Sequence, residues 1–262
     1  MGLDFLWSPD FLGTPNVGAW LFGGLVVASF ATNYFSVVAG TAGGLMLLVI
    51  MASFFPPSVL IPVHTLIQLG SGSTRAFSMW TYVLKGTLAP FTLGSVAGAA
   101  LGSQLIVQLP TAVLLGVLGV FILIITWLPR IGLFGPERGR FAALGFFVTL
   151  LGVFVSATGT LVGAFVAAAS PDRRNHVSTM AALMAITHTA KMAAFFWAGF
   201  GIGPYLPLVL GLIAGGMVGN TVGEHSLNRM KEDWFRVLFK LIMTLLALRL
   251  LWNAAREFGW VG

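Results

Sequence analysis

The sequence predicts an all-α polytopic membrane protein made of two inverted repeats of about five helical segments, each opening with a broken, re-entrant helical hairpin. Three observations predict this fold class: an apolar composition, ten separate apolar segments, and a glycine–threonine break that occurs twice. Of 262 residues, 57% are hydrophobic and 8% are charged, and the mean hydropathy is +0.94. Soluble domains carry about 25% charged residues. The composition therefore excludes a soluble domain and indicates a chain that crosses the bilayer several times.

The apolar segments are separated by short turns that contain proline or charged residues. They cover residues 16–33, 41–54, 58–81, 86–107, 111–129, 141–157, 160–170, 175–199, 203–223 and 234–255. A helix needs about 20 residues to cross the hydrocarbon core. Segments 41–54 and 160–170 contain only 14 and 11 residues. We therefore expect each to reach part-way and to pair with the preceding segment as a hairpin that dips into the bilayer.

The two short segments begin at related breaks, GTAGG at 40–44 and GTLVG at 159–163. Interrupted hydrophobic segments at matching places in two halves of a chain indicate the substrate site of a transporter. Irregular backbone at membrane depth is tolerated only where protein or a water-filled cavity surrounds it. We therefore expect both breaks to lie in the protein interior, near one shared central site.

A second repeated pattern consists of glycines at four-residue spacing. The pattern occurs once in each half of the chain, at Gly94, Gly98 and Gly102 and again at Gly215, Gly219 and Gly223. Small residues at this spacing let membrane helices approach closely. The two patterns divide the chain into an N-terminal transmembrane repeat (1–129), a cytoplasmic linker (130–140) and a C-terminal transmembrane repeat (141–262).

The distribution of lysine and arginine predicts the topology. If each break were part of one continuous crossing, the basic loop residues would divide evenly between the two faces. If the chain reverses at each break, nine basic residues share one face and only Arg256 lies opposite. The nine are Lys85, Arg130, Arg138, Arg140, Arg173, Arg174, Arg229, Lys231 and Arg236. The positive-inside rule favours the second arrangement. It predicts a multi-pass protein of the inner cell membrane, with inverted repeats and both termini on the outer side.

The positions of the acidic residues argue against one class of transporter. All eight lie at predicted loops, termini or segment ends: Asp4, Asp10, Glu137, Asp172, Glu224, Glu232, Asp233 and Glu257. Pumps for protons, Na⁺ or metal cations normally place a carboxylate within the membrane, where it serves as relay or ligand. The absence of acids from the segment interiors argues against a cation as the transported substrate.

Two basic residues within the apolar segments point to an anion. Arg75 lies in segment 58–81 and Lys191 in segment 175–199, and neither segment interior contains an acid. A cation at the bilayer centre costs about 2.5 kcal/mol or more, and a bound anion would offset this cost. Arginine also offers a planar fork suited to an oxyanion. The alternative is that both side chains snorkel to the membrane interface.

The breaks supply further candidate substrate contacts. Glycine lets the backbone approach a ligand, and a helix that starts there presents free N–H groups to an anion. The alternative is that these glycines only permit a tight hairpin, with threonine as an N-cap. Polar residues nearby complete the set, although each of them has interhelical hydrogen bonding or helix capping as its alternative. The predicted substrate-binding residues are Gly40, Thr41, Gly43, Gly44, Gln68, Arg75, Ser156, Gly159, Thr160, His188 and Lys191.

Enzyme signatures are not found in the sequence. It contains no His-Glu-x-x-His, no Gly-x-Ser-x-Gly and no phosphate-binding Gly-x-x-x-x-Gly-Lys-Ser/Thr motif. We expect no catalytic activity, no metal, no cofactor and no nucleic-acid partner. Without an ATP site, transport would be secondary or passive.

In this combination of features the sequence resembles the sulfite exporter TauE/SafE permease family. The resemblance rests on the glycine-rich breaks at 40–44 and 159–163, the helix starts His64-Thr65-Leu66 and Ser178-Thr179-Met180, and the two glycine runs. It covers about residues 17–256. It implies secondary transport of a sulfur-containing or organic anion, such as sulfite or a sulfonate.

The sequence therefore leads to the hypothesis of an alternating-access permease that binds a small anion between two inverted repeats. A passive anion channel is the alternative, and an intramembrane enzyme would need a nucleophile–base pair that the sequence does not offer. H⁺ or Na⁺ could be the coupling ion, and the protein could form homo-oligomers.

Overall fold

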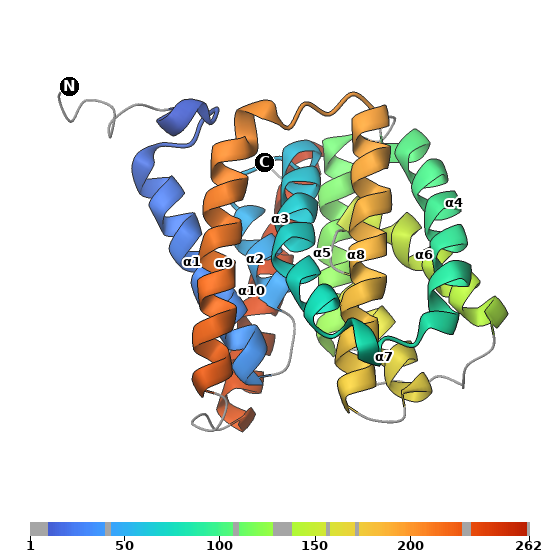
Figure 1. The fold of residues 1–262 in the computed structure, drawn as a ribbon. Helices are drawn as coiled ribbons and strands as arrows, with labels where there is room; N and C mark the ends of the chain where they lie inside the picture. Colours follow the sequence, from blue (N-terminus) through green and yellow to red (C-terminus); the bar gives the residue numbers. More distant parts are fainter. Residues whose placement is uncertain are drawn as a thin grey trace.

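The computed structural model describes residues 10–39, 43–106, 110–127, 138–155, 158–170, 173–226 and 232–260, and these residues form an all-helical bundle without strands (Figure 1). The α helices are α1 (Ala19–Ala39), α2 (Gly43–Met51), α3 (Pro57–Ser78), α4 (Leu88–Ile106), α5 (Thr111–Trp127), α6 (Arg138–Val155), α7 (Gly159–Ala169), α8 (Arg173–Trp197), α9 (Leu206–Ser226) and α10 (Glu232–Glu257). Short 3₁₀ helices cover Phe11–Gly13, Trp80–Tyr82, Lys85–Thr87 and Gly203–Tyr205. Each predicted apolar segment overlaps one of the α helices, so the all-α prediction is confirmed.

Two segment ends differ from the prediction because of proline. Segment 41–54 forms a helix only to Met51, and residues 52–55 turn before Pro56 and Pro57. A proline disfavours the helical conformation of the residue before it, and proline itself suits the first position of a helix. The proline pair therefore ends α2 early and starts α3.

The first hairpin forms where α1 is followed by α2 across the break at 40–42. The two helices pack against each other, and Gly43 at the start of α2 lies against Thr32 and Ser36 of α1. A side chain at Gly43 would collide with the Thr32 carbonyl oxygen, so this close turn requires glycine. In the second half, α7 follows α6 across 156–157 and packs along α8.

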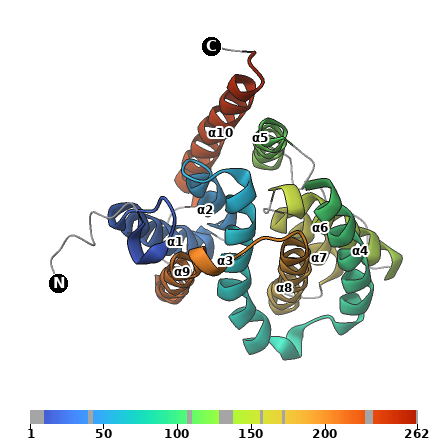
Figure 2. The ribbon, with the colours of Figure 1, turned by 90° about the horizontal axis from the view of Figure 1, so that it is seen from above.

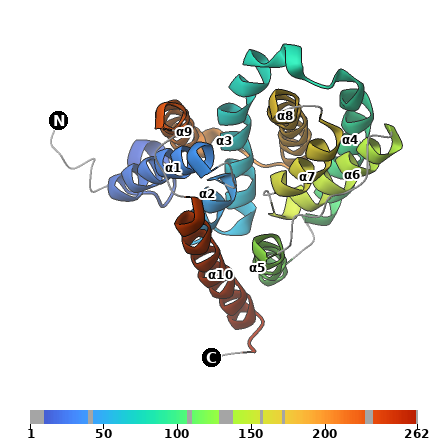
Figure 3. The same cartoon turned by 90° about the horizontal axis from the view of Figure 1, so that it is seen from below.

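The main helix contacts join parts of the chain that are far apart in sequence. Helix α1 packs on α9, α4 on α6, α3 on α8 and α5 on α10. Figures 2 and 3, which view the bundle from its two ends, show α3 and α8 between the α1–α9 pair and the α4–α6 pair. The α5–α10 pair lies at the edge of the bundle (Figure 2).

The glycine runs lie at these contacts. A Cβ atom at Gly94 or Gly98 of α4 would collide with backbone carbonyl oxygens of α6, at Ala142 and Phe146. In the same way, Gly219 of α9 lies against the backbone of α1. The prediction that these glycines serve close helix packing is confirmed for the described positions.

The outside of the bundle is apolar. Large hydrophobic side chains are exposed on most helices, including Trp20 (78%), Leu93 (73%) and Trp197 (90%), while polar side chains such as His64 and Thr65 are fully buried. A surface of apolar side chains around buried polar side chains fits a lipid environment. Within the described residues, Gly203–Gly223 is a helical stretch long and apolar enough to cross a membrane by itself, and shorter apolar helices cover Thr111–Ile124 and Gly139–Val155.

Aromatic and basic side chains meet at the helix ends. Lys240 lies 5.0 Å from the ring centroid of Trp127, and Trp127 donates a hydrogen bond from Nε1 to Thr244 Oγ1 (3.0 Å). Arg174 donates a hydrogen bond from Nη1 to the hydroxyl of Tyr82 (3.1 Å). Amphipathic aromatic rings are typical of the membrane–water interface.

The glycine packing predicts the effect of a bulky substitution. Gly98→Leu should lower the stability of the protein by about 1–3 kcal/mol or more, because overpacking forces backbones apart. Thermal unfolding of the purified protein in detergent measures this loss. The matched control is Gly23→Leu in α1, where an added Cβ meets nothing within 4 Å. Equal unfolding temperatures for the two variants would contradict the structural role of Gly98.

Candidate functional site

The candidate site lies where α3 and α8, the helices that follow the two hairpins, pack against each other. Both carry buried polar side chains at this contact. The exposed fraction is 0% for His64 on α3 and for Lys191 on α8, and 4% for His188 on α8. In a bundle whose outer surface is apolar, this concentration of polar groups in the interior distinguishes a functional site from ordinary packing.

The first break is held against α3. The Nε2 atom of His64 donates a hydrogen bond to the carbonyl oxygen of Gly44 (2.8 Å). Gln68 lies one turn further along α3, and any side chain at Gly44 would collide with its amide group. Residues four apart share one face of a helix, so His64 and Gln68 present one polar face to the start of α2. A larger residue at position 44 would therefore have to displace the flexible Gln68 side chain.

The second break lies against α8. Met180 and Met184 face the start of α7, since a Cβ atom at Gly159 would lie 3.6 Å and 3.7 Å from their methyl carbons. These are ordinary van der Waals distances, so the packing at Gly159 does not require glycine.

Lys191 reaches the second break from α8. A Cβ atom placed on Gly152 of α6 would lie 3.3 Å from Lys191 Cδ, 3.7 Å from Lys191 Nζ and 3.4 Å from Thr158 Oγ1. The ammonium group and the threonine hydroxyl thus border the same small space beside Gly152. Thr158 is 1% exposed and precedes the first residue of α7, and its hydroxyl does not cap that helix. The positive end of the α7 dipole therefore lies beside Lys191.

The two histidines belong to the same electrostatic environment. The charge of Lys191 acts on the imidazoles of both His64 and His188. His188 also lies on the α8 face that carries Met184 and Lys191, because helix positions three and four apart are neighbours. The structure thus brings four predicted residues into one region: Gly44, Gln68, His188 and Lys191.

Of the remaining predicted residues, Gly43 packs against α1 and Gly159 against the methionines of α8, and the other five divide into two groups. Gly40, Thr41 and Ser156 lie outside the described residues. For Arg75 and Thr160 the structure describes the backbone alone, which places Arg75 near the end of α3 and Thr160 as the second residue of α7.

Two residues at this site were not among the predicted substrate contacts. His64 carries a recognisable signal, because it precedes Gln68 by one helical turn and shares its face. Thr158 directly precedes the second Gly-Thr frame, and its signal is its position just before a predicted helix start.

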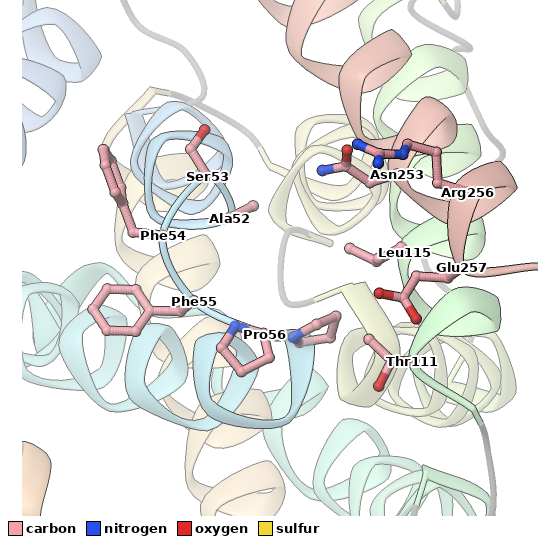
Figure 4. A pocket seen from close by; sticks show the side chains of 11 residues that line it. Ala52, Ser53, Phe54, Phe55, Pro56, Thr111, Leu115, Asn253, Arg256 and Glu257 are labelled. Carbon is pink, nitrogen blue, oxygen red and sulfur yellow. The ribbon is translucent and has the colours of Figure 1, made fainter. Parts of the chain in front are cut away.

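A separate cavity of about 670 Å³ lies at the end of the bundle where α10 ends. Figure 4 shows its walls, which come from the α2–α3 turn (Ser53 to Pro57), the first turns of α5 and the last turns of α10. Arg256, Asn253 and Glu257 line it on the α10 side. This cavity does not include the buried lysine or the histidines of the central site.

Comparison with known families identifies the chain. The model of the family described as sulfite exporter TauE/SafE matches residues 25–250, which include both hairpins and the central site. No match was found among curated proteins or among solved structures. The chain belongs to the sulfite exporter TauE/SafE family of membrane transporters.

Proposed function

We propose that this protein is a secondary permease for a small sulfur-containing or organic anion of the sulfite or sulfonate class. The anion would bind in the centre of the bundle and reach either side by alternating access. The observation that carries the proposal is the full burial of Lys191 beside Thr158 and the start of α7. A buried ammonium group, a hydroxyl and a helix N-terminus together form a site that favours negative charge.

The set of donors supports an oxyanion in particular. The polar groups around the two breaks include the buried imidazoles of His64 and His188, the buried ammonium group of Lys191, and the partly buried amide of Gln68. An anion with several oxygens can accept hydrogen bonds from donors on different sides at once. We propose that Gly40, Thr41, Gly43, Gly44, Arg75, Ser156, Gly159 and Thr160 complete this site from the two breaks and from α3.

An inverted repeat is supported by the pattern of helix packing. Helix α1 of the first half packs on α9 of the second, and α6 of the second half packs in turn on α4 of the first. Helix α3 packs on its counterpart α8, and α5 on its counterpart α10. A twofold axis between the halves would exchange the members of each of these contacts. We propose that residues 1–129 and 141–262 are the repeats and that 130–140 joins them on the cytoplasmic side.

The two hairpins add a local argument for the repeat. His64 and Gln68 face the first break from α3, just as Met180 and Met184 face the second break from α8. In both halves, the helix after the hairpin holds the break with two residues one turn apart. The chemical difference between the two pairs would make the site asymmetric, with polar donors concentrated on the α3 side of the first break.

Alternating access would follow from the closely packed pairs. The α1–α9 and α4–α6 pairs join at glycines, where backbones touch, so each pair would move as one unit against the α3–α8 centre. Opening on one side of the membrane and closing on the other would then expose the same site in turn. A passive anion channel, the alternative, would instead need a continuous wet path.

A substitution of the buried lysine tests the site. Lys191→Met should lower the rate of sulfite and sulfonate uptake into proteoliposomes by about tenfold or more, because a charge-assisted hydrogen bond contributes about 1.5–3 kcal/mol. Lys240→Met is the matched control, since Lys240 is exposed at Trp127. Uptake by the Lys191 variant at the wild-type rate would refute the proposed site. Saturable exchange supports a carrier, and conductive flux that does not saturate would support the channel.

The proposed topology can be tested by cysteine labelling, because the chain contains no native cysteine. Single cysteines at Lys85 and Arg174 should react with a membrane-impermeant reagent from the cytoplasmic side. A cysteine at Arg256 should react from the outside, because the start of α1 and the end of α10 lie at the same end of the bundle (Figure 1). Labelling of positions 85 and 174 from opposite sides would rule out the inverted arrangement.

A further inference from the structure

We propose that His188 takes up a proton when the anion binds, so that anion transport by this protein is coupled to protons. This inference rests on the proposed function, because it concerns the same central site. It assigns one residue as the proton carrier and selects H⁺ over Na⁺ as the coupling ion.

His188 is buried and has a ring nitrogen that is available to accept a proton. Its side chain is 96% buried, since 4% is exposed, and its Nδ1 atom has no hydrogen-bond partner among the described residues. A buried polar atom without a partner costs about 1–3 kcal/mol, which a structural histidine would avoid by packing against a carbonyl or a hydroxyl. The nearby His64 does so, because its Nε2 donates to Gly44.

The charges that act on His188 all have the same sign. Lys191 lies one turn away on α8, and the second group is His64, which lies on the neighbouring helix α3. Helices α4 and α7 contribute no ionisable side chain, and those of α6 are confined to its first turn, at Arg138 and Arg140. The 3₁₀ helix Trp80–Tyr82 contributes Tyr82, which lies near the start of α8, where its hydroxyl accepts a hydrogen bond from Arg174 Nη1. A proton on His188 therefore meets positive charge from its neighbours.

An anion in this site changes that balance. A negative charge beside Lys191 attracts a proton to the neighbouring imidazole, because opposite charges favour the protonated form. Binding linkage is reciprocal, so a proton on His188 must strengthen anion binding by the same factor. Each transported anion would then carry a proton with it.

The donor chemistry of the site favours H⁺ over Na⁺. Hard cations such as Na⁺ prefer oxygen ligands, and carboxylates serve most often inside membranes. The titratable groups gathered around His188 are an ammonium group and an imidazole, both nitrogen bases. Such groups bind protons and repel metal cations once they are charged.

The test uses methanesulfonate, which stays a monoanion from about pH 5 to pH 9, a range that brackets the ordinary titration of histidine. Its binding to the purified full-length protein is measured across this range by calorimetry. For wild type, the affinity should fall with rising pH by up to about tenfold per unit, the slope for one linked proton. Binding in weak buffer with a pH indicator should show uptake of up to one proton per anion.

His188→Gln keeps hydrogen-bonding capacity and removes titration, so its affinity should become nearly independent of pH. His176→Gln is the matched control. His176 also has a buried Nδ1 without a hydrogen-bond partner in the described residues, but it lies three turns away at the start of α8, so this variant should keep the wild-type slope.

The outcomes separate the two proposals. Wild-type binding that is independent of pH and releases or takes up no proton would overturn proton coupling and leave the anion site standing. A pH slope that persists in His188→Gln would show that another group carries the proton. An absence of saturable methanesulfonate binding at every pH would count against the proposed function itself. If His188→Gln does not fold, proton uptake by the wild-type protein still decides whether coupling occurs.

Discussion

The burial of the Lys191 ammonium group is the constraint on which the rest of this structure depends. A cation in the interior of a membrane protein costs several kcal/mol unless polar groups or an opposite charge surround it. The neighbours of the Lys191 ammonium group are Thr158, the first turn of α7 and two imidazoles, and the positive end of the α7 dipole does not offset its charge. The centre of the bundle therefore favours a negative charge. The break before α7, this short helix and the lysine together create that preference.

Close backbone packing makes room for that centre. Glycines on α4 and α9 let these helices touch α6 and α1 at backbone distance. Gly152 has a related role, because it leaves the space in which Lys191 and Thr158 meet. Small residues thus serve two purposes here: they join helices into units and they admit polar side chains to the interior. A transporter needs both, since rigid units must move around a site that remains polar.

The sequence predicted much of the candidate site, and the gaps have physical causes. Lys191 and His188 were candidates because they lie within an apolar segment, although snorkelling of Lys191 to the interface stayed open, and Gly44 and Gln68 were candidates from the break and the helix that follows it. In the sequence, His64 stood out only at the start of a helix, and its hydrogen bond to the Gly44 carbonyl of the first break depends on how α2 and α3 pack. The role of Thr158 could not be predicted, because nothing in the local sequence shows that Lys191, 33 positions later, borders the same space.

Hydropathy, segment length and glycine spacing are local properties, and they were enough to establish an all-helical membrane protein with ten segments, two breaks and two close-packing faces. Local sequence properties predict membrane helices well, because every backbone N–H and C=O group in the hydrocarbon must form its hydrogen bond within its own helix. Local properties do not determine which helices become neighbours. The pairing of α1 with α9 and of α4 with α6, and the meeting of His64 with His188 and Lys191, depend on contacts between helices that are separated in the sequence by other helices. Only the folded chain decides these contacts, because they depend on the shapes of surfaces that separate helices present to each other.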